Sequence, residues 1–136
     1  MAAKSMTIVM HADDLDKSMA AFILASGAAA KGMDVTMFFT FWGLMAMKKG
    51  GADKVKLSKF RLFTGMMKKV MKKHNVATLD ELIKDCGELG VRMVACEMTM
   101  ELMNTPKESL RKEVTEVGGV GTYLDAAVES RITLFI

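Results

Sequence analysis

Short apolar runs of strand length alternate along the chain with stretches whose apolar residues recur at helical spacing. The runs in the middle of the chain are almost wholly apolar, as is typical of parallel strands covered on both faces. Predicted strands span residues 7–11, 33–41, 91–95, 114–117 and 131–136, and predicted helices span residues 15–31, 44–49, 64–73, 79–89, 97–103, 106–112 and 122–130. This alternation predicts an α/β fold: a three-layer α/β/α domain with a mainly parallel five-stranded sheet.

Polar residues mark where several of these helices begin. Asp13 and Asp14 precede the first long helix and supply its amino cap. Thr78 and Glu81 form a capping box, in which each side chain satisfies a backbone amide at the helix start. Thr105 and Glu108 have the same spacing, which predicts a second capping box that opens a short helix.

Composition excludes several classes of protein. The two cysteines are ten residues apart, which fits neither a disulfide framework nor a common zinc pattern. The longest uncharged runs have 13 residues, fewer than the roughly 20 that a membrane-spanning helix needs. Acidic residues interrupt the first apolar run where a signal peptide would continue. We therefore expect a cytoplasmic protein without a spanning helix.

Metal and nucleic-acid binding are poorly supported by the sequence. Cys96, Met100 and Met103 share a helical face, and their sulfur atoms suit Cu(I). The chain has 15 methionines, however, so this grouping arises easily by chance. Aromatic residues are not interleaved with the lysines as the stacking platforms of nucleic-acid-binding proteins are. The sequence therefore predicts no metal site, no cofactor and no nucleic-acid partner.

Positive charge is concentrated in residues 44–74, which contain nine lysines and Arg61 against Asp53 as the single acid. We interpret this segment as a basic, methionine-rich insertion within one domain spanning residues 1–136. Its helix at residues 64–73 carries methionines and a valine on one side and lysines on the other. Such a stripe usually packs on its own domain, but a basic amphipathic helix also suits a partner or a membrane surface.

Cys96 is the candidate catalytic residue. It follows a buried strand and precedes a helix, and open α/β sheets carry their chemistry at the carboxyl ends of the strands. A helix amino terminus favours the thiolate, which is the form that attacks a disulfide or accepts a sulfane sulfur. Cys86 instead falls on the apolar face of its helix and is interpreted as an inert core residue. One reactive cysteine fits a one-thiol carrier better than a dithiol oxidoreductase.

Other residues are expected at the same edge, because the carboxyl ends of parallel strands meet there. His11 ends the first strand, Trp42 and Gly43 follow the second, and the Gly118-Gly119 turn follows the fourth. We interpret these five as candidate substrate-binding residues around the cysteine. Each also has a structural explanation: a strand-end histidine as a packing residue, for example, or a tryptophan as an apolar lid or interface anchor.

Four blocks of sequence resemble a known family. They are DLDK at residues 14–17, MFFTFWGL at residues 37–44, ACEMTM at residues 95–100 and VGGVGTYL at residues 117–124. With these blocks the chain resembles the DsrE/DsrF-like family, in its soluble branch that is sometimes labelled peroxiredoxin-like. The resemblance implies an α/β sulfur-carrier fold, usually assembled as a homo-oligomer, with persulfide sulfur carried on Cys96. It also implies small sulfur-carrier or rhodanese-type proteins as partners.

Two functional hypotheses follow. The first is a sulfur-transfer protein, either a sulfurtransferase or a persulfide carrier, that uses Cys96 alone. The alternative is a non-catalytic oligomeric binding protein that docks on a partner or a membrane surface through residues 44–74.

Overall fold

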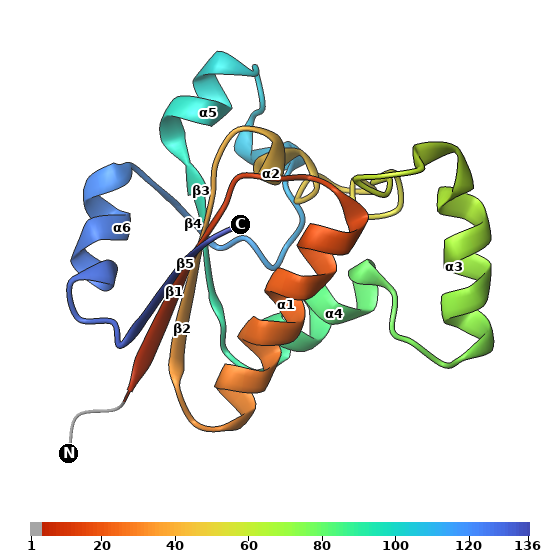
Figure 1. Cartoon of the computed structure of the whole chain (residues 1–136). Coiled ribbons are helices and arrows are strands. Elements are labelled where there is room, and N and C mark those ends of the chain that lie inside the picture. Colours follow the sequence, from red (N-terminus) through yellow and green to blue (C-terminus); the bar gives the residue numbers. More distant parts are fainter. Residues whose placement is uncertain (1–3) are drawn as a thin grey trace.

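Residues 4–136 are described by a computed structural model, in which five strands form one sheet between layers of helices (Figure 1). The strands are β1 (Ser5–Met10), β2 (Asp34–Phe39), β3 (Arg92–Cys96), β4 (Glu116–Gly118) and β5 (Ile132–Phe135). Their order across the sheet is β4-β3-β2-β1-β5, and each strand pair is parallel. The predicted α/β fold with a parallel five-stranded sheet is confirmed.

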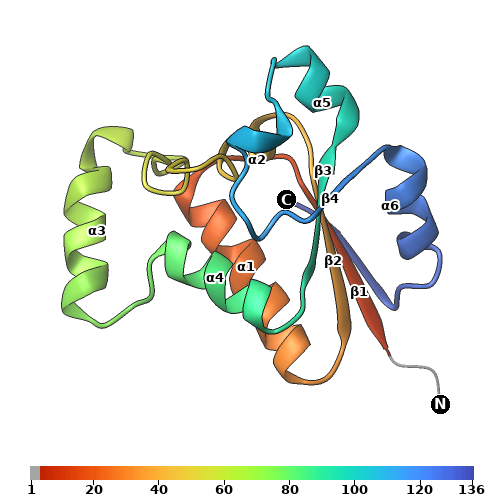
Figure 2. The ribbon, with the colours of Figure 1, turned by 180° about the vertical axis from the view of Figure 1, so that it is seen from behind.

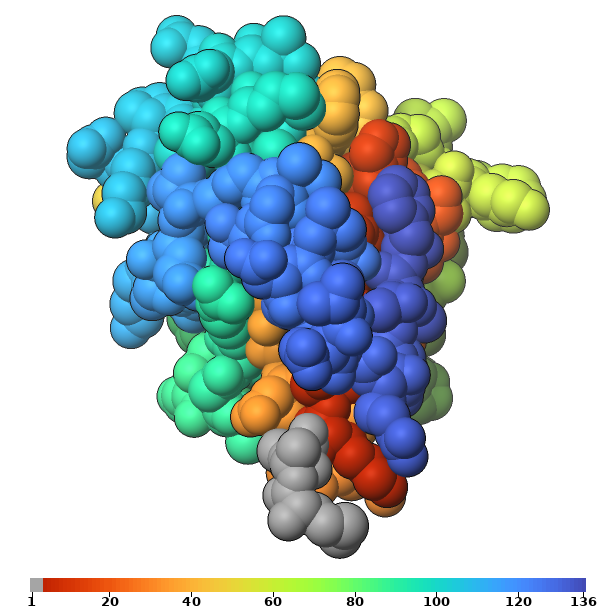
Figure 3. All heavy atoms as spheres, turned by 90° about the vertical axis from the view of Figure 1, so that its left-hand side faces the viewer, coloured from red at the N-terminus to blue at the C-terminus, as the bar shows by residue number. Residues whose placement is uncertain are grey.

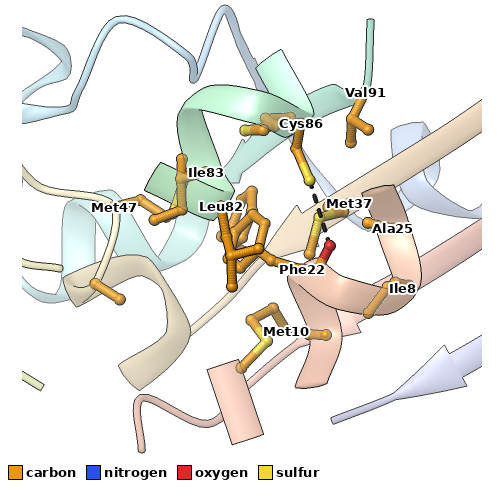
Figure 4. Packing of buried hydrophobic residues seen from close by; sticks show 14 of the residues in the cluster. Ile8, Met10, Phe22, Ala25, Met37, Met47, Leu82, Ile83, Cys86 and Val91 are labelled. Atoms are coloured by element: carbon orange, nitrogen blue, oxygen red, sulfur yellow. Dashed lines mark hydrogen bonds between the residues drawn. The ribbon is translucent and has the colours of Figure 1, made fainter. Parts of the chain in front are cut away.

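Helices cover the two faces of the sheet unequally. They are α1 (Leu15–Ala30), α2 (Trp42–Met45), α3 (Thr64–Lys73), α4 (Leu79–Glu88), α5 (Glu97–Leu102) and α6 (Val120–Ala127), with 3₁₀ turns η1 (Arg61–Phe63) and η2 (Lys107–Ser109). Figures 1 and 2 show α1 and α4 on one face and α6 on the other. Most of the core lies on the α1 and α4 side, where Phe22, Met37 and Ile83 are fully buried together (Figure 4).

Side chains alternate between the two faces along each strand. In β3, Met93 and Ala95 belong to the core on the α1 side, whereas Val94 and Cys96 belong to a smaller cluster that includes Tyr123 of α6. The candidate cysteine therefore lies on the thinly covered face of the sheet.

The connections that leave β3 and β4 diverge to opposite faces of the sheet. After β3 the chain passes through α5 and η2 and packs Leu110 and Val114 into the core on the α1 side. After β4 it enters α6 on the other face. Neighbouring parallel strands whose connections diverge leave a crevice at their carboxyl ends, where open α/β sheets bind ligands. Cys96 and Gly118 are paired in register at this position.

Helix α3 stands away from the rest of the protein, beyond the connector that follows α2 (Figures 1 and 2). Its one buried residue is Thr64, while Met66, Met67 and Val70 are exposed. Met71 packs against the core. The expectation that this apolar stripe packs on its own domain is therefore wrong for most of the stripe. No helix within residues 4–136 is long and apolar enough to cross a bilayer.

The predicted helix starts differ in their outcome. In α4 the hydroxyl of Thr78 accepts from the amide of Glu81, whose carboxylate accepts from the amide of Thr78, so this capping box is confirmed. Asp14 occupies the capping position of α1 but makes no capping hydrogen bond. Its carboxylate instead forms ion pairs with Lys17 and Arg61.

Several predicted elements have other extents in the structure: the helix predicted at residues 44–49 is α2 at Trp42–Met45, and the strand predicted at residues 114–117 is β4 at Glu116–Gly118. Two further differences have a local cause. The helix predicted at residues 106–112 shrinks to the turn η2, because the hydroxyl of Thr105 donates to the carbonyl oxygen of Met103 and caps no helix. The second strand ends early, at Phe39, because Phe41 adopts a positive φ that no strand tolerates.

Candidate functional site

Cys96 is the last residue of β3 and the residue immediately before α5 begins. Its side chain packs with Phe38, Val94 and Tyr123 on the α6 face of the sheet, and 5% of the residue is exposed. Helix α6 covers this face, and none of its own residues is buried. The thiol is therefore shielded from solvent by α6, although this helix buries none of its own residues against the sheet.

Two threonine hydroxyls accompany the thiol, one from the turn after β2 and one from the first turn of α5. The Oγ1 atoms of Thr40 and Thr99 lie 3.1 Å apart. The backbone amide of Phe41 donates to Oγ1 of Thr99 over 3.0 Å. Thr99 is fully buried. These bonds tie the end of β2 to the start of α5 beside the cysteine.

Burial opposes ionisation and by itself raises the pKa of Cys96, but neighbouring donors outweigh it. The hydroxyl and amide of Thr99, the hydroxyl of Thr40 and the amide of Met98 stabilise the thiolate, so the pKa of Cys96 lies below its ordinary value. Both amides belong to the start of α5, where the helix dipole also favours negative charge. The arrangement therefore supports the thiolate, which is the nucleophilic form.

The turn that carries the Phe41 amide is strained. Phe41 has φ 48° and ψ −125°, a conformation that costs a non-glycine residue about 1–3 kcal/mol. Its ring lies against the ring of His11, with centroids 5.6 Å apart. Strain of this kind persists where surrounding contacts hold it and is concentrated at functional sites. Here the strained turn carries the amide that bonds Thr99.

His11 and Trp42 are not brought against the cysteine. His11 follows the last residue of β1, and β2 separates β1 from β3. The backbones of His11 and Cys96 are therefore roughly 10 Å apart at ordinary strand spacing. The imidazole lies between the rings of Phe41 and Phe135, at centroid distances of 5.6 and 5.7 Å. Trp42 begins α2 and is 53% exposed. A substrate-binding role for either residue stays a prediction.

Two of the three candidate glycines have packing roles. A Cβ at Gly43 would lie 2.2 Å from the carbonyl oxygen of Met10, so glycine lets α2 approach the end of β1. A Cβ at Gly118 would lie 2.7 Å from the hydroxyl of Thr122, so glycine lets α6 begin close to the cysteine. Gly119 occupies the capping position of α6 and has open space around its α-carbon. Substrate binding by these glycines also stays a prediction.

Cys86 is buried in the core, as its helical position predicts. Figure 4 shows it beside Phe22 and Ile83, with its thiol donating to the carbonyl oxygen of Phe22 over 3.4 Å. Burial, with a smaller effect from Asp85, raises the pKa of the Cys86 thiol to about 11. At neutral pH this cysteine is therefore a thiol without access to solvent.

Thr99 was overlooked in the sequence. Its signal is a threonine three residues after a cysteine that precedes a helix, which is the spacing of a capping box. That spacing places the two side chains together at the helix start. The pairing of Thr40 with Thr99 depends on the sheet, because the two residues belong to the ends of different strands.

The sequence profile of the DsrE/DsrF/DrsH-like family matches residues 2–62 and 52–135, which together span nearly the whole chain. The chain belongs to this family. This result confirms the resemblance carried by the four sequence blocks.

YrkE of Bacillus subtilis (strain 168), an uncharacterized protein, is 44% identical over 157 aligned positions, which cover 98% of this chain and 97% of YrkE. The sulfur carrier protein DsrE2 of Allochromatium vinosum is 36% identical over 160 positions, which cover the whole of both chains. Both alignments are longer than the 136 residues of this chain. The two relatives therefore contain residues that this chain lacks.

Solved structures share the fold of this family member. The crystal structure of the ychN protein from E. coli has a TM-score of 0.67 at 12% identity, with 98% of this chain and 99% of that chain covered. BT1422 from Bacteroides thetaiotaomicron has a TM-score of 0.60 at 14% identity, with 98% and 95% covered. Similarity at this level of identity concerns the fold alone.

Proposed function

We propose that this protein accepts sulfane sulfur as a persulfide on Cys96 and passes it to an acceptor. The observation that carries the proposal is a single thiol, with a lowered pKa, at the point where the connections from β3 and β4 diverge. Membership of the DsrE/DsrF/DrsH-like family and similarity to a protein named a sulfur carrier support the same role.

The transfer needs no external oxidant or reductant. The Cys96 thiolate attacks the outer sulfur of a donor persulfide, RS–SH, and a new S–S bond forms as the donor S–S bond breaks. The donor leaves as the thiolate RS⁻, and the persulfide hydrogen stays with the transferred sulfur. Delivery repeats the step in reverse, with the acceptor thiolate attacking and Cys96 leaving. Cys86 takes no part because it is buried and un-ionised.

The proposed partners are small sulfur-carrier or rhodanese-type proteins in the cytoplasm. We also propose that the chain acts as a homo-oligomer. Figure 3 shows the chain segments of α6 and β5 at the surface of the protein. Apolar side chains exposed on these two elements support association with another chain. These residues are Val120, Leu124, Val128, Ile132 and Phe135.

Intact-mass measurement after incubation with polysulfide tests the sulfur-carrier proposal. We expect mass increments of whole sulfur atoms on the wild type and on Cys86→Ala, which is the matched control, and none on Cys96→Ala. Dithiothreitol should remove the increment, because a persulfide is reducible by thiols. An increment that persists in Cys96→Ala, or that never appears on the wild type, refutes the proposal.

A second candidate function is docking on a partner or membrane surface through the basic segment, without chemistry at Cys96. The observation that favours it is the exposure of α3 and of the turn η1 before it. Leu62 of η1 is 98% exposed, and methionines and lysines of α3 are exposed as well. Lys69 and Lys73 flank the apolar stripe of α3 on its lysine-rich side.

Flotation with vesicles of anionic and of neutral lipid tests this candidate. Binding to anionic vesicles should weaken with salt, should fall in the double variant Lys69→Gln, Lys73→Gln, and should be indifferent to Cys96→Ala. Absence of flotation with both vesicle types, together with no partner retained in pull-downs, removes the candidate.

A further inference from the structure

Helix α3 carries exposed apolar side chains beside a row of lysines. Met66 and Val70 are four residues apart, so they lie one turn apart on the same side of the helix, and they are 60% and 45% exposed. Lys69 and Lys73 have the same spacing and form an exposed basic row next to them. Within residues 4–136 neither lysine of the basic row takes part in an ion pair. The outward face of α3 is therefore both apolar and positively charged.

Helix α5 repeats this arrangement with the opposite charge. Met98 and Leu102 are four residues apart and are 53% and 65% exposed. Glu97 and Glu101 have the same spacing and form an exposed acidic row, whose carboxylates pair with no cation in the described part of the chain. Figures 1 and 2 show α5 beyond the carboxyl ends of the strands and α3 beyond the connector, so the two helices do not meet within one chain.

Charge decides which surface each helix can face. If α3 of one copy packed on α3 of another, two basic rows would meet, and contact between two α5 helices would bring two acidic rows together; like charges at an interface repel. An anionic membrane would attract the basic row but repel the acidic row, and the apolar side chains of α5 would stay exposed. Contact between α3 and α5 of two copies instead joins opposite charges and covers the apolar side chains of both helices.

We propose that α3 of one copy of this chain packs against α5 of a second copy, with the basic row beside the acidic row. The proposal rests on the proposed homo-oligomer and adds this contact to the surfaces of α6 and β5. Because two different surfaces meet, the contact is heterologous, and its repetition closes into a ring or continues as a filament. Since α5 begins at the residue after Cys96, each contact brings the basic row of one copy to the sheet edge that holds the thiol of the next.

Sedimentation velocity over a range of protein concentrations tests the contact, in a reducing buffer that prevents disulfides between copies. The wild type should associate, and its association should weaken with salt. Two double variants reverse one row each: Lys69→Glu with Lys73→Glu, and Glu97→Lys with Glu101→Lys. Each should raise the dissociation constant roughly tenfold or more, because attraction between the rows becomes repulsion.

An equal mixture of the two double variants should associate again. In the mixture the reversed α3 of one variant faces the reversed α5 of the other, and the unchanged helices form the wild-type contact. Recovery also shows that both variants are folded. The control is Lys4→Glu with Lys31→Glu, which changes the net charge as the α3 variant does but lies before β1 and β2, at the amino ends of the strands. This control should associate as the wild type does.

Three results overturn the proposal. The first is a mixture that does not associate more strongly than its components. The second is wild-type association in both double variants; if Leu124→Lys on α6 then abolishes association, the homo-oligomer stands and this contact is wrong. The third is an α3 variant that keeps its self-association but loses binding to anionic vesicles, because α3 would then contact lipid. A wild type that is monomeric at every concentration refutes the homo-oligomer together with this contact, whereas the carrier function is decided separately by polysulfide loading.

Discussion

Iodoacetamide should label Cys96 and spare Cys86 in the folded protein. Alkylation proceeds through the thiolate, and the two thiols differ in ionisation and in exposure. Burial raises the pKa of Cys86 to about 11, and the residue has no exposed surface. Cys96 has some exposed surface, and hydrogen-bond donors bring its pKa below the ordinary value in spite of burial.

The size of the difference follows from the ionised fractions. At about pH 8, a thiol with a pKa of about 11 is roughly 0.1% thiolate. Cys96, with a pKa below the ordinary value of 9.0, is at least about one tenth thiolate at the same pH. Ionisation alone therefore favours Cys96 by about a hundredfold or more, before the complete burial of Cys86 is considered.

Peptide mass spectrometry after brief exposure to the reagent gives the two rates in one sample. The control is the same protein unfolded in guanidinium chloride, in which both cysteines should react at similar rates because both have ordinary pKa values there. Comparable labelling of Cys86 and Cys96 in the folded protein would refute the reasoning. So would a pH midpoint for Cys96 above the ordinary range of a cysteine.

Two further predictions concern stability. Gly43→Ala should lower the free energy of unfolding by about 1–3 kcal/mol in urea titrations, because its Cβ would meet a backbone oxygen of β1. Gly121→Ala is the control: a Cβ at Gly121 would have nothing within 4 Å, so this variant should keep the wild-type free energy of unfolding. Equal losses of stability in the two variants would contradict the packing role of Gly43. Asp80→Asn should cost about 1 kcal/mol at neutral pH, because Asp80 pairs with Lys84 and with buried Arg111. Lys84 first, and then Arg111, lower the pKa of Asp80. The stabilisation by ionised Asp80 is therefore present above the unfolded pKa of about 3.9, and the difference in unfolding free energy between wild type and Asp80→Asn should vanish as pH falls through the folded pKa. A difference that is unchanged in acid would contradict this reasoning.

Local patterns predicted the elements where local interactions decide them. The capping box at Thr78 and Glu81 formed because both partners lie within one turn of helix. The same spacing at Thr105 and Glu108 gave no helix, because the Thr105 hydroxyl bonds the carbonyl of Met103, an equally local partner. Sequence spacing alone does not distinguish these two outcomes.

The exposed stripe of α3 is another limit of the sequence pattern. Periodicity correctly predicts that Met66, Met67 and Val70 share a side of a helix. Whether that side is covered depends on which other segment reaches it, and the connector carries α3 away from the sheet (Figure 1). Burial of a helical face is therefore a property of the packed chain.

The sequence by itself determined that Cys96 ends a buried strand at the start of a helix and that Cys86 lies on a core-facing stripe. Both facts depend on periodicity within single elements. The tertiary structure alone decided which residues surround Cys96. Strand order places Thr40 and Gly118 beside it and His11 two strands away, because pairing between distant segments is set by packing and chain connections and not by local pattern.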